Sequence, residues 1–187
     1  MPDSYWDPLP HIEPVFAELP AFGLRPDPED VFRGRWEDLN WRNVPGPLYG
    51  GMTDTCFVGR QGAPRHIMYC EDGEFLYRQP TTAPELRDVL IGMRYDPWSG
   101  WACDGDEHWT PDLVRAWWRD RRRVRDWILC MQLEWGAEGE PFEEHEAAGL
   151  VDYLAYLDGG LATDLRVYLH FLDHGRGPAP GEPLPPL

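Results

Sequence analysis

The densest group of chemically capable side chains lies at residues 104–108, Asp-Gly-Asp-Glu-His. Asp104, Asp106 and His108 offer two carboxylates and an imidazole, the groups that general acid–base catalysis uses. In such a site His108 is the acid or the base, and the carboxylates orient it. The same acids are typical of a polar turn before a helix, whose N-terminus favours negative charge. Both interpretations stay open. An EF-hand is excluded, because no glutamate closes a twelve-residue loop after Asp104.

Arg121 is the fourth catalytic candidate, because it is a charged residue within an apolar helical stripe. A guanidinium buried with that stripe needs a carboxylate partner or an opening into a cleft. If the helix protrudes instead, the side chain reaches water across apolar surface. The wider arginine run at 119–125 can contact phosphate, but in so acidic a chain we expect it to pair with the protein's own acids.

Residues 49–56, Tyr-Gly-Gly-Met-Thr-Asp-Thr-Cys, place adjacent glycines before a polar run. Adjacent glycines permit close backbone approach to a ligand, to a partner or, most simply, to the next strand. This segment, the polar cluster and the helix after it supply the candidate binding residues Tyr49, Asp54, Glu107, Trp109 and Trp118.

His170 and His174 are spaced i and i+4, which places both on one helix face and can hold a transition metal. The glutamate that follows the first histidine in metalloprotease helices is absent, and histidines near a helix end also suit its dipole. We therefore assign no metal and keep these two as the candidates for one. Cys70 and Cys130 are expected to fill small spaces in the core. The chain has no Cys-x-x-Cys, Walker loop, dinucleotide fingerprint or nucleophile elbow, so we expect no cofactor.

The elements that must position these residues indicate an α+β fold, in which a small antiparallel β-meander packs against about four helices. Three β-prone runs lie at 55–58, 66–70 and 74–78, and the Asp-Gly pair at 72–73 predicts a hairpin between the last two. Helices are predicted at 83–93, 142–157 and 161–174, with a short one after Asp27.

The clearest helix begins after Thr110, which is a good cap, with Pro111 at the first helical position. Its apolar stripe has steps of three and four residues: Val114, Trp117, Arg121, Val124, Ile128, Met131 and Trp135. Along the chain we expect an extended proline-rich arm at 1–28, a single domain at 29–174 and a flexible tail at 175–187, which is rich in proline and glycine.

Thirty-three acids and seventeen arginines give a formal net charge of −16, and the chain has no lysine. Residues 110–135 carry +2, whereas residues 136–187 carry −8. The net negative charge repels phosphate backbones and anionic lipid, so we expect neither general nucleic-acid binding nor membrane binding. Ten tryptophans indicate a packed core. The N-terminus has no leader pattern and no stretch suits a membrane helix, so we expect a cytoplasmic protein with cysteine thiols.

Five segments form a recognisable set: Trp-Arg-Asn-Val-Pro-Gly-Pro-Leu-Tyr-Gly-Gly at 41–51, Thr-Asp-Thr-Cys at 53–56, Tyr-Arg-Gln-Pro at 77–80, Asp-Gly-Asp-Glu-His-Trp-Thr-Pro at 104–111 and Trp-Trp at 117–118. Together they resemble a family of small actinobacterial proteins that has no established activity. In charge and size alone, the chain is also similar to immunity proteins of polymorphic toxin systems.

Acidity, abundant aromatic residues and the lack of a recognised catalytic motif favour a protein-binding function. We expect an inhibitor or immunity-type module that docks on a more basic protein. The alternative is a small hydrolase-like enzyme that uses the Asp/His cluster. The sequence makes no prediction of oligomeric state.

Overall fold

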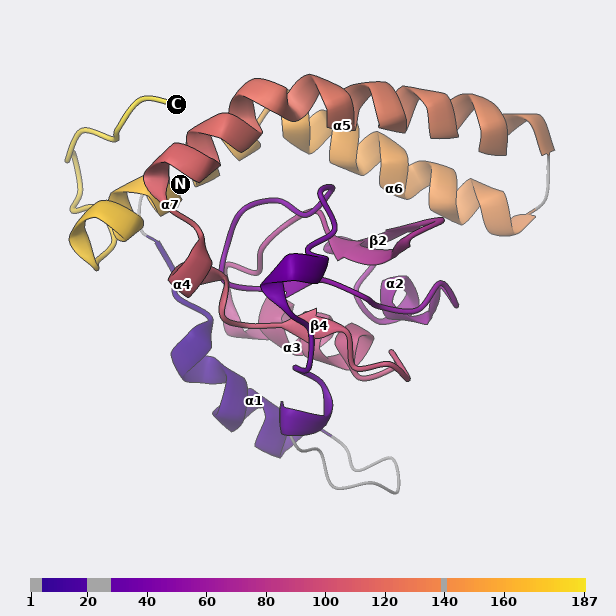
Figure 1. Cartoon of the computed structure of the whole chain (residues 1–187), viewed down its shortest axis with the longest axis horizontal. Helices are drawn as coiled ribbons and strands as arrows, with labels where there is room; N and C mark the ends of the chain where they lie inside the picture. Colours follow the sequence, from indigo (N-terminus) through magenta and orange to yellow (C-terminus); the bar gives the residue numbers. More distant parts are fainter. Residues whose placement is uncertain (1–4, 20–27, 139–140) are drawn as a thin grey trace. The chain divides into compact units, whose positions relative to one another are not determined.

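The computed structural model describes residues 5–19, 28–138 and 141–187 (Figure 1). The described chain divides into two compact units, Trp6–His108 and Trp109–Leu187, the second of which also includes Tyr5. The division falls within residues 29–174, which the sequence predicted as a single domain. The α+β class is confirmed, since both helices and antiparallel sheets are present.

The unit Trp6–His108 contains short helices and two small sheets. Its elements are α1 (Ile12–Glu18), β1 (Tyr49–Gly50), α2 (Val58–Gly62), β2 (Ile67–Cys70), β3 (Gly73–Leu76), α3 (Ala83–Met93), β4 (Trp101–Ala102) and α4 (Gly105–His108), with 3₁₀ turns at Leu9–His11, Pro28–Asp30 and Trp36–Asp38. The two 3₁₀ turns at 28–38 stand where a short helix was predicted, and its cap, Asp27, lies outside the described residues.

The predicted hairpin is confirmed, but the third strand of the meander is not. β2 and β3 pair antiparallel, with Cys70 opposite Gly73 at the turn. Residues 55–58 form no strand, because Phe57 takes a left-handed φ of 65° and α2 begins at Val58. The second ladder is instead β1 with β4, which pairs Tyr49 with Ala102 and Gly50 with Trp101. In the part of the chain that the structure describes, the sheets are therefore two separate two-stranded ladders.

The core of this unit forms where α1 and α3 pack with the hairpin. Its buried members include Ile12, Phe16, Leu48, Ile67, Leu76, Leu86, Val89, Leu90, Met93 and Trp101. The predicted helix at 83–93 is confirmed as α3, and Thr82 Oγ1 caps it by accepting from the Glu85 N–H at 3.3 Å. Burying each large side chain stabilises the fold by about 1.5–3 kcal/mol.

The N-terminal segment differs from the extended arm that its prolines indicated. Residues 12–18 form α1, which buries Ile12, Val15 and Phe16. Pro14 is accommodated because it lies in the first turn, where a backbone N–H has no partner within the helix. The rest of the predicted arm, residues 1–4 and 20–27, lies outside the described residues.

The chain's two asparagines, Asn40 and Asn43, tie the loop at 40–43 to both ladders. Asn43 Oδ1 accepts from the N–H groups of Gly50 in β1, at 2.9 Å, and Leu76 in β3, at 2.8 Å. Asn40 Nδ2 donates to Cys70 Sγ at 3.5 Å. Both asparagines are buried, so their hydrogen bonds replace those lost to water.

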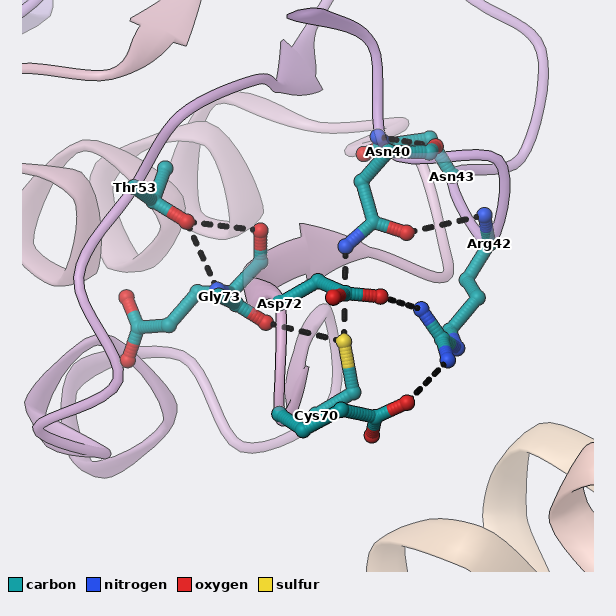
Figure 2. Close-up of polar contacts among 9 residues, drawn as sticks. Asn40, Arg42, Asn43, Thr53, Cys70, Asp72 and Gly73 are labelled. Carbon is teal, nitrogen blue, oxygen red and sulfur yellow. Dashed lines mark hydrogen bonds and ion pairs between the residues drawn. The ribbon is translucent and has the colours of Figure 1, made fainter.

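Arg42, between these asparagines, anchors the turn of the hairpin (Figure 2). Its Nη1 lies 3.0 Å from Asp72 Oδ2, and its Nη2 lies 2.9 Å from Glu71 Oε1. The Arg42 side chain is only 4% exposed, whereas each acid is 64% exposed. The buried guanidinium therefore depends on these two acids for its compensating charge.

The unit Trp109–Leu187 is built on three helices, α5 (Pro111–Glu138), α6 (Pro141–Asp158) and α7 (Leu161–His174). All three predictions are confirmed. Thr110 Oγ1 accepts from the Leu113 N–H at 3.3 Å at the start of α5. From the predicted stripe, Val114, Val124 and Ile128 are buried. α5 and α6 lie side by side (Figure 1), and an ion pair from Arg125 to Asp158 joins them.

The tail at 175–187, predicted to be flexible, makes specific contacts with α5 and α7. Arg166 donates to the carbonyl oxygens of Pro185 and Leu184, each at 2.9 Å, and Arg115 donates to Pro186 O at 3.1 Å. Proline-rich chain is suited to this role, because its carbonyls are free to accept. Within the described residues, no helix combines the length and the apolar character that crossing a membrane requires.

Candidate functional site

The β1–β4 ladder positions one set of polar side chains at each of its ends: Asp96 at one end and the cluster at 104–108 at the other. One backbone hydrogen bond extends it at each end: Gly51 N to Gly100 O at 2.9 Å, and Gly105 N to Pro47 O at 3.0 Å. The first bond brings the loops at 51–57 and 94–100 together. The second places the polar cluster at 104–108 beside Tyr49.

The cluster at 104–108 is organised around Asp104. Its Oδ1 accepts a hydrogen bond from the Tyr49 hydroxyl at 2.8 Å, and its Oδ2 lies 3.2 Å from Nε2 of His108. Trp36 stacks on the His108 ring, with centroids 4.9 Å apart, and meets Tyr49 edge-on. The side chain of His108 is 34% exposed. Asp104 therefore joins a buried phenol to a partly exposed imidazole, which Trp36 holds in place.

The groups beside this imidazole are poor nucleophiles. Burial, and then the hydrogen bond with Asp104, raises the pKa of Tyr49 far above its ordinary value. Burial, and then the charge of Asp104, raises the pKa of Cys103 to about 11. A thiol attacks as its thiolate, so a raised pKa makes Cys103 unreactive at neutral pH. Acid–base chemistry at His108 would therefore act on water or on a bound molecule.

The structure brings together only part of the predicted catalytic set. Asp104 and His108 are in contact, and Asp106 lies between them on α4 with a half-buried side chain. Glu107 is exposed on the same helix, and Trp109 is buried. Arg121 belongs to the other compact unit.

Arg121 contacts another predicted binding residue, Trp118. Its guanidinium carbon lies 3.9 Å from the centroid of the Trp118 ring, and its Nη1 donates to Trp118 O at 2.8 Å. The sequence predicted a carboxylate partner or an opening into a cleft for Arg121. Its guanidinium stacks on an aromatic ring. Such stacking fixes the guanidinium plane.

At the other end of the ladder, Asp96 fixes a loop that the sequence analysis did not single out. Its Oδ1 accepts from the N–H groups of Asp54, at 3.1 Å, and Trp98, at 3.0 Å, and its Oδ2 accepts from Gly100 N at 2.6 Å. Asp96 is buried, which raises its pKa, while the three donors oppose the rise. The Asp-Pro-Trp-Ser-Gly run was a local signal for such a turn.

The loop that Asp96 holds displays large apolar side chains to solvent. Trp98 is 64% exposed and Tyr95 is 44% exposed. Met52, on the adjoining loop, is 57% exposed. The loops touch through their backbones, since a Cβ added at Gly100 would lie 2.0 Å from Met52 O. We name Met52, Tyr95 and Trp98 the Trp98 patch.

Two further acids are buried behind these loops. Asp54, a predicted binding residue, is 5% exposed, and its Oδ1 accepts a hydrogen bond from the Cys56 N–H at 3.2 Å. Glu74 is fully buried, and its Oε1 accepts from Gly59 N at 2.8 Å, so it caps α2 from a distant part of the chain. Burial raises the pKa of Glu74 to about 8, against the opposing hydrogen bond from Gly59. These acids serve the fold of the loops.

The metal candidates His170 and His174 are engaged with protein groups. Nδ1 of His170 lies 3.2 Å from Arg176 O, and its Nε2 lies 3.2 Å from Glu182 Oε1. Nδ1 of His174 lies 2.9 Å from His170 O. Among the described residues, no three His, Cys, Asp or Glu side chains form a group able to hold a metal ion. His170 therefore contacts the tail, and His174 contacts His170.

The cysteines differ in their surroundings. Cys70 is buried, as predicted, and burial raises its pKa. Cys130 is exposed on α5, so its prediction as a core residue was wrong. The stripe residue Ile128 is buried, but the helical repeat turns position 130 outward. Cys56 is exposed, and the hydrogen bond with Asp54 raises its pKa.

Comparisons with protein-family models, with curated proteins and with solved structures found no match. The resemblance to small actinobacterial proteins stays a prediction.

Proposed function

We propose that this chain is a protein-binding module of the inhibitor or immunity type, which docks on a more basic protein through the Trp98 patch. The observation that carries the proposal is a tryptophan that is 64% exposed on a loop held by three hydrogen bonds to one buried carboxylate. Tryptophan is among the residues that contribute most to binding at interfaces.

The backbone of the loop supports a role in binding, because it is fixed before any partner arrives. Ser99 takes a left-handed φ of 55°, which is uncommon for a residue with a side chain. Its carbonyl accepts from Arg33 N at 3.0 Å, and its hydroxyl donates to Asp30 O. A surface ordered in advance loses less conformational entropy on binding. Strained residues held in this way cluster at functional sites.

The charge of the unit indicates the kind of partner. Residues 6–108 contain eighteen acids and nine arginines, a net charge of −9. A unit with this net charge associates faster with a basic protein and disfavours acidic ones. The proposed partner is therefore a protein with a basic surface around an apolar pocket.

The test is capture of partners from an extract of the source organism by three immobilised proteins: the wild type, Trp98→Ala and Leu133→Ala. Leu133 is the matched control, because it is 79% exposed but lies on α5 in the other unit. We expect the wild type and Leu133→Ala to retain one basic protein stoichiometrically, and Trp98→Ala to lose it. Retention of no protein, retention of an acidic one, or equal retention by Trp98→Ala would each reject the proposal.

The contact between Asp104 and His108 favours a second candidate, acid–base catalysis on a hydrolysable small molecule. An ester and amide substrate panel is assayed with the wild type, His108→Asn and Asp104→Asn. Hydrolysis that falls at least about a hundredfold in both variants supports catalysis, since positioned acid–base groups contribute roughly 10²–10⁴-fold. Equal rates for all three proteins reject it.

A further inference from the structure

A cavity of about 190 Å³ lies between α5 and the C-terminal end of α6, and it is lined by Arg121, Arg122, Arg125, Leu157 and Asp158. This volume corresponds to roughly six water molecules in the liquid. Arg121 and Arg125 are one helical turn apart, as are Arg122 and Arg125, so all three side chains reach the same side of α5. Three arginines thus converge on one small space in a chain whose net charge is −16.

Arg121 makes no ion pair with any carboxylate among the described residues. Its contacts are with the ring and the carbonyl oxygen of Trp118. An arginine has five N–H donors, and the hydrogen bond to Trp118 O uses one of them. The stacked guanidinium is therefore oriented, positively charged and able to donate to a ligand in the cavity.

The other lining charges leave a positive balance. Arg125 is paired with Asp158 across the two helices. Arg122 is 87% exposed, and its Nε lies 3.6 Å from Asp126 Oδ2, beyond hydrogen-bond distance. Among the described residues, Asp158 is the one acid that lines the cavity, and Asp126 forms an ion pair with Arg122 beside it. Three arginines and these two acids leave a local charge of +1, which favours an anion.

We propose that this cavity binds the phosphate group of a small soluble molecule. Arg121 and Arg122 donate to the phosphate oxygens, and Arg125 contributes charge from its ion pair with Asp158. A planar guanidinium donates two parallel hydrogen bonds to phosphate, a geometry that lysine lacks. A membrane headgroup is disfavoured as the source, because the acidic chain is repelled by an anionic surface.

The test is titration with inorganic phosphate. Binding is measured by calorimetry and by the shifts of the NMR signals of the arginine side chains and the Trp118 indole. Four proteins are compared: the wild type, Arg121→Gln, Arg119→Gln and Asp158→Asn. Arg119 is the matched control, since it lies on α5 but does not line the cavity, and it donates to Arg115 O. Circular dichroism and thermal unfolding confirm that each variant is folded.

We expect saturable binding of one phosphate per wild-type chain, with shifts of the Arg121 and Trp118 signals. Arg121→Gln should weaken binding at least about tenfold, as expected for loss of a hydrogen bond to a charged group. Arg119→Gln should change it less than about twofold, and Asp158→Asn should tighten it by removing the opposing charge.

Three results would overturn the proposal: no saturable binding, equal weakening by both arginine variants, or no gain from Asp158→Asn. Vesicles of phosphatidylcholine with phosphatidic acid test the other source of the same group. If these vesicles bind the wild type and Arg121→Gln loses that binding, the ligand is a lipid headgroup and the proposal of a soluble ligand is wrong.

Discussion

The free energy of unfolding of the wild type should fall as the pH rises, and replacing Glu74 by glutamine should abolish this fall. The folded protein holds a proton on Glu74 up to a pKa of about 8, because the carboxyl is fully buried. In the unfolded chain the same group has an ordinary pKa near 4.3. Between these two values the unfolded state is ionised and the folded state is not. The free energy of unfolding therefore falls as the pH rises through this window, and becomes level above it.

The size of the effect follows from the two pKa values. When the folded state holds one proton more than the unfolded state, the free energy of unfolding falls by about 1.4 kcal/mol per pH unit. Over the interval between the two pKa values the total fall is at most roughly 5 kcal/mol. The neighbours Asp54 and Asp96 add to the cost of ionising Glu74, because their charges also raise its pKa. Glutamine keeps an oxygen that can accept from the Gly59 N–H, but it has no proton to lose.

The assay is urea unfolding of the wild type, Glu74→Gln and Glu107→Gln at pH 5, 6.5 and 8. Glu107 is the control, since it is an exposed glutamate of the same unit. Relative to the wild type, Glu74→Gln should gain about 2–4 kcal/mol between pH 5 and pH 8, while Glu107→Gln keeps a nearly constant difference. A difference for Glu74→Gln that does not change with pH would refute the assignment of a buried, protonated carboxyl.

Three further predictions concern single side chains. Arg42→Ala should lower the free energy of unfolding by about 1–3 kcal/mol, measured by urea unfolding, because the packing of the buried side chain and its hydrogen bonds to Glu71 and Asp72 are lost. A loss below about 0.5 kcal/mol contradicts this role. Gly100→Ala should cost about 1–3 kcal/mol in the same assay, because its Cβ would lie 2.0 Å from Met52 O, and a neutral result would contradict the close contact. In mass-spectrometric alkylation at pH 7.5, exposed Cys130 should react before Cys103, whose pKa is about 11, and the reverse order would show that Cys103 is activated.

Features that depend on neighbouring residues were predictable from the sequence. Thr110 and Pro111 define the start of α5 because a cap acts on N–H groups two or three residues away. The hairpin turn is equally local, since Asp72 and Gly73 suit its backbone. The contact of Asp104 with His108 follows from their spacing of four residues on and before α4.

Contacts between distant segments were not predictable in the same way. β1 is two residues long, and its partner β4 lies about fifty residues later, so no alternation of apolar residues marks the pair. Glu74 caps α2 across fifteen residues, and Asp96 caps a loop across forty-two. A sequence shows that such acids exist but not which N–H groups they meet. The Trp98 patch was missed for this reason, because its order depends on Asp96.

Pro14, the single proline of residues 12–18, illustrates a different error. Proline frequency favoured an extended arm, yet Pro14 sits in the first turn of α1, where it is tolerated. Burial of Ile12, Val15 and Phe16 at helical spacing decided the outcome. The position of a proline within a candidate helix is therefore more informative than the number of prolines.

The most direct test of binding through the Trp98 patch is kinetic, with the purified partner and surface plasmon resonance at 50, 150 and 500 mM salt. The proposal predicts that the association rate of the wild type falls as salt is added, because steering by charge is screened. It also predicts that Trp98→Ala weakens affinity by at least about thirtyfold, mainly through faster dissociation, as expected for a residue worth about 2 kcal/mol or more. An association rate independent of salt, together with unchanged dissociation of Trp98→Ala, would contradict it.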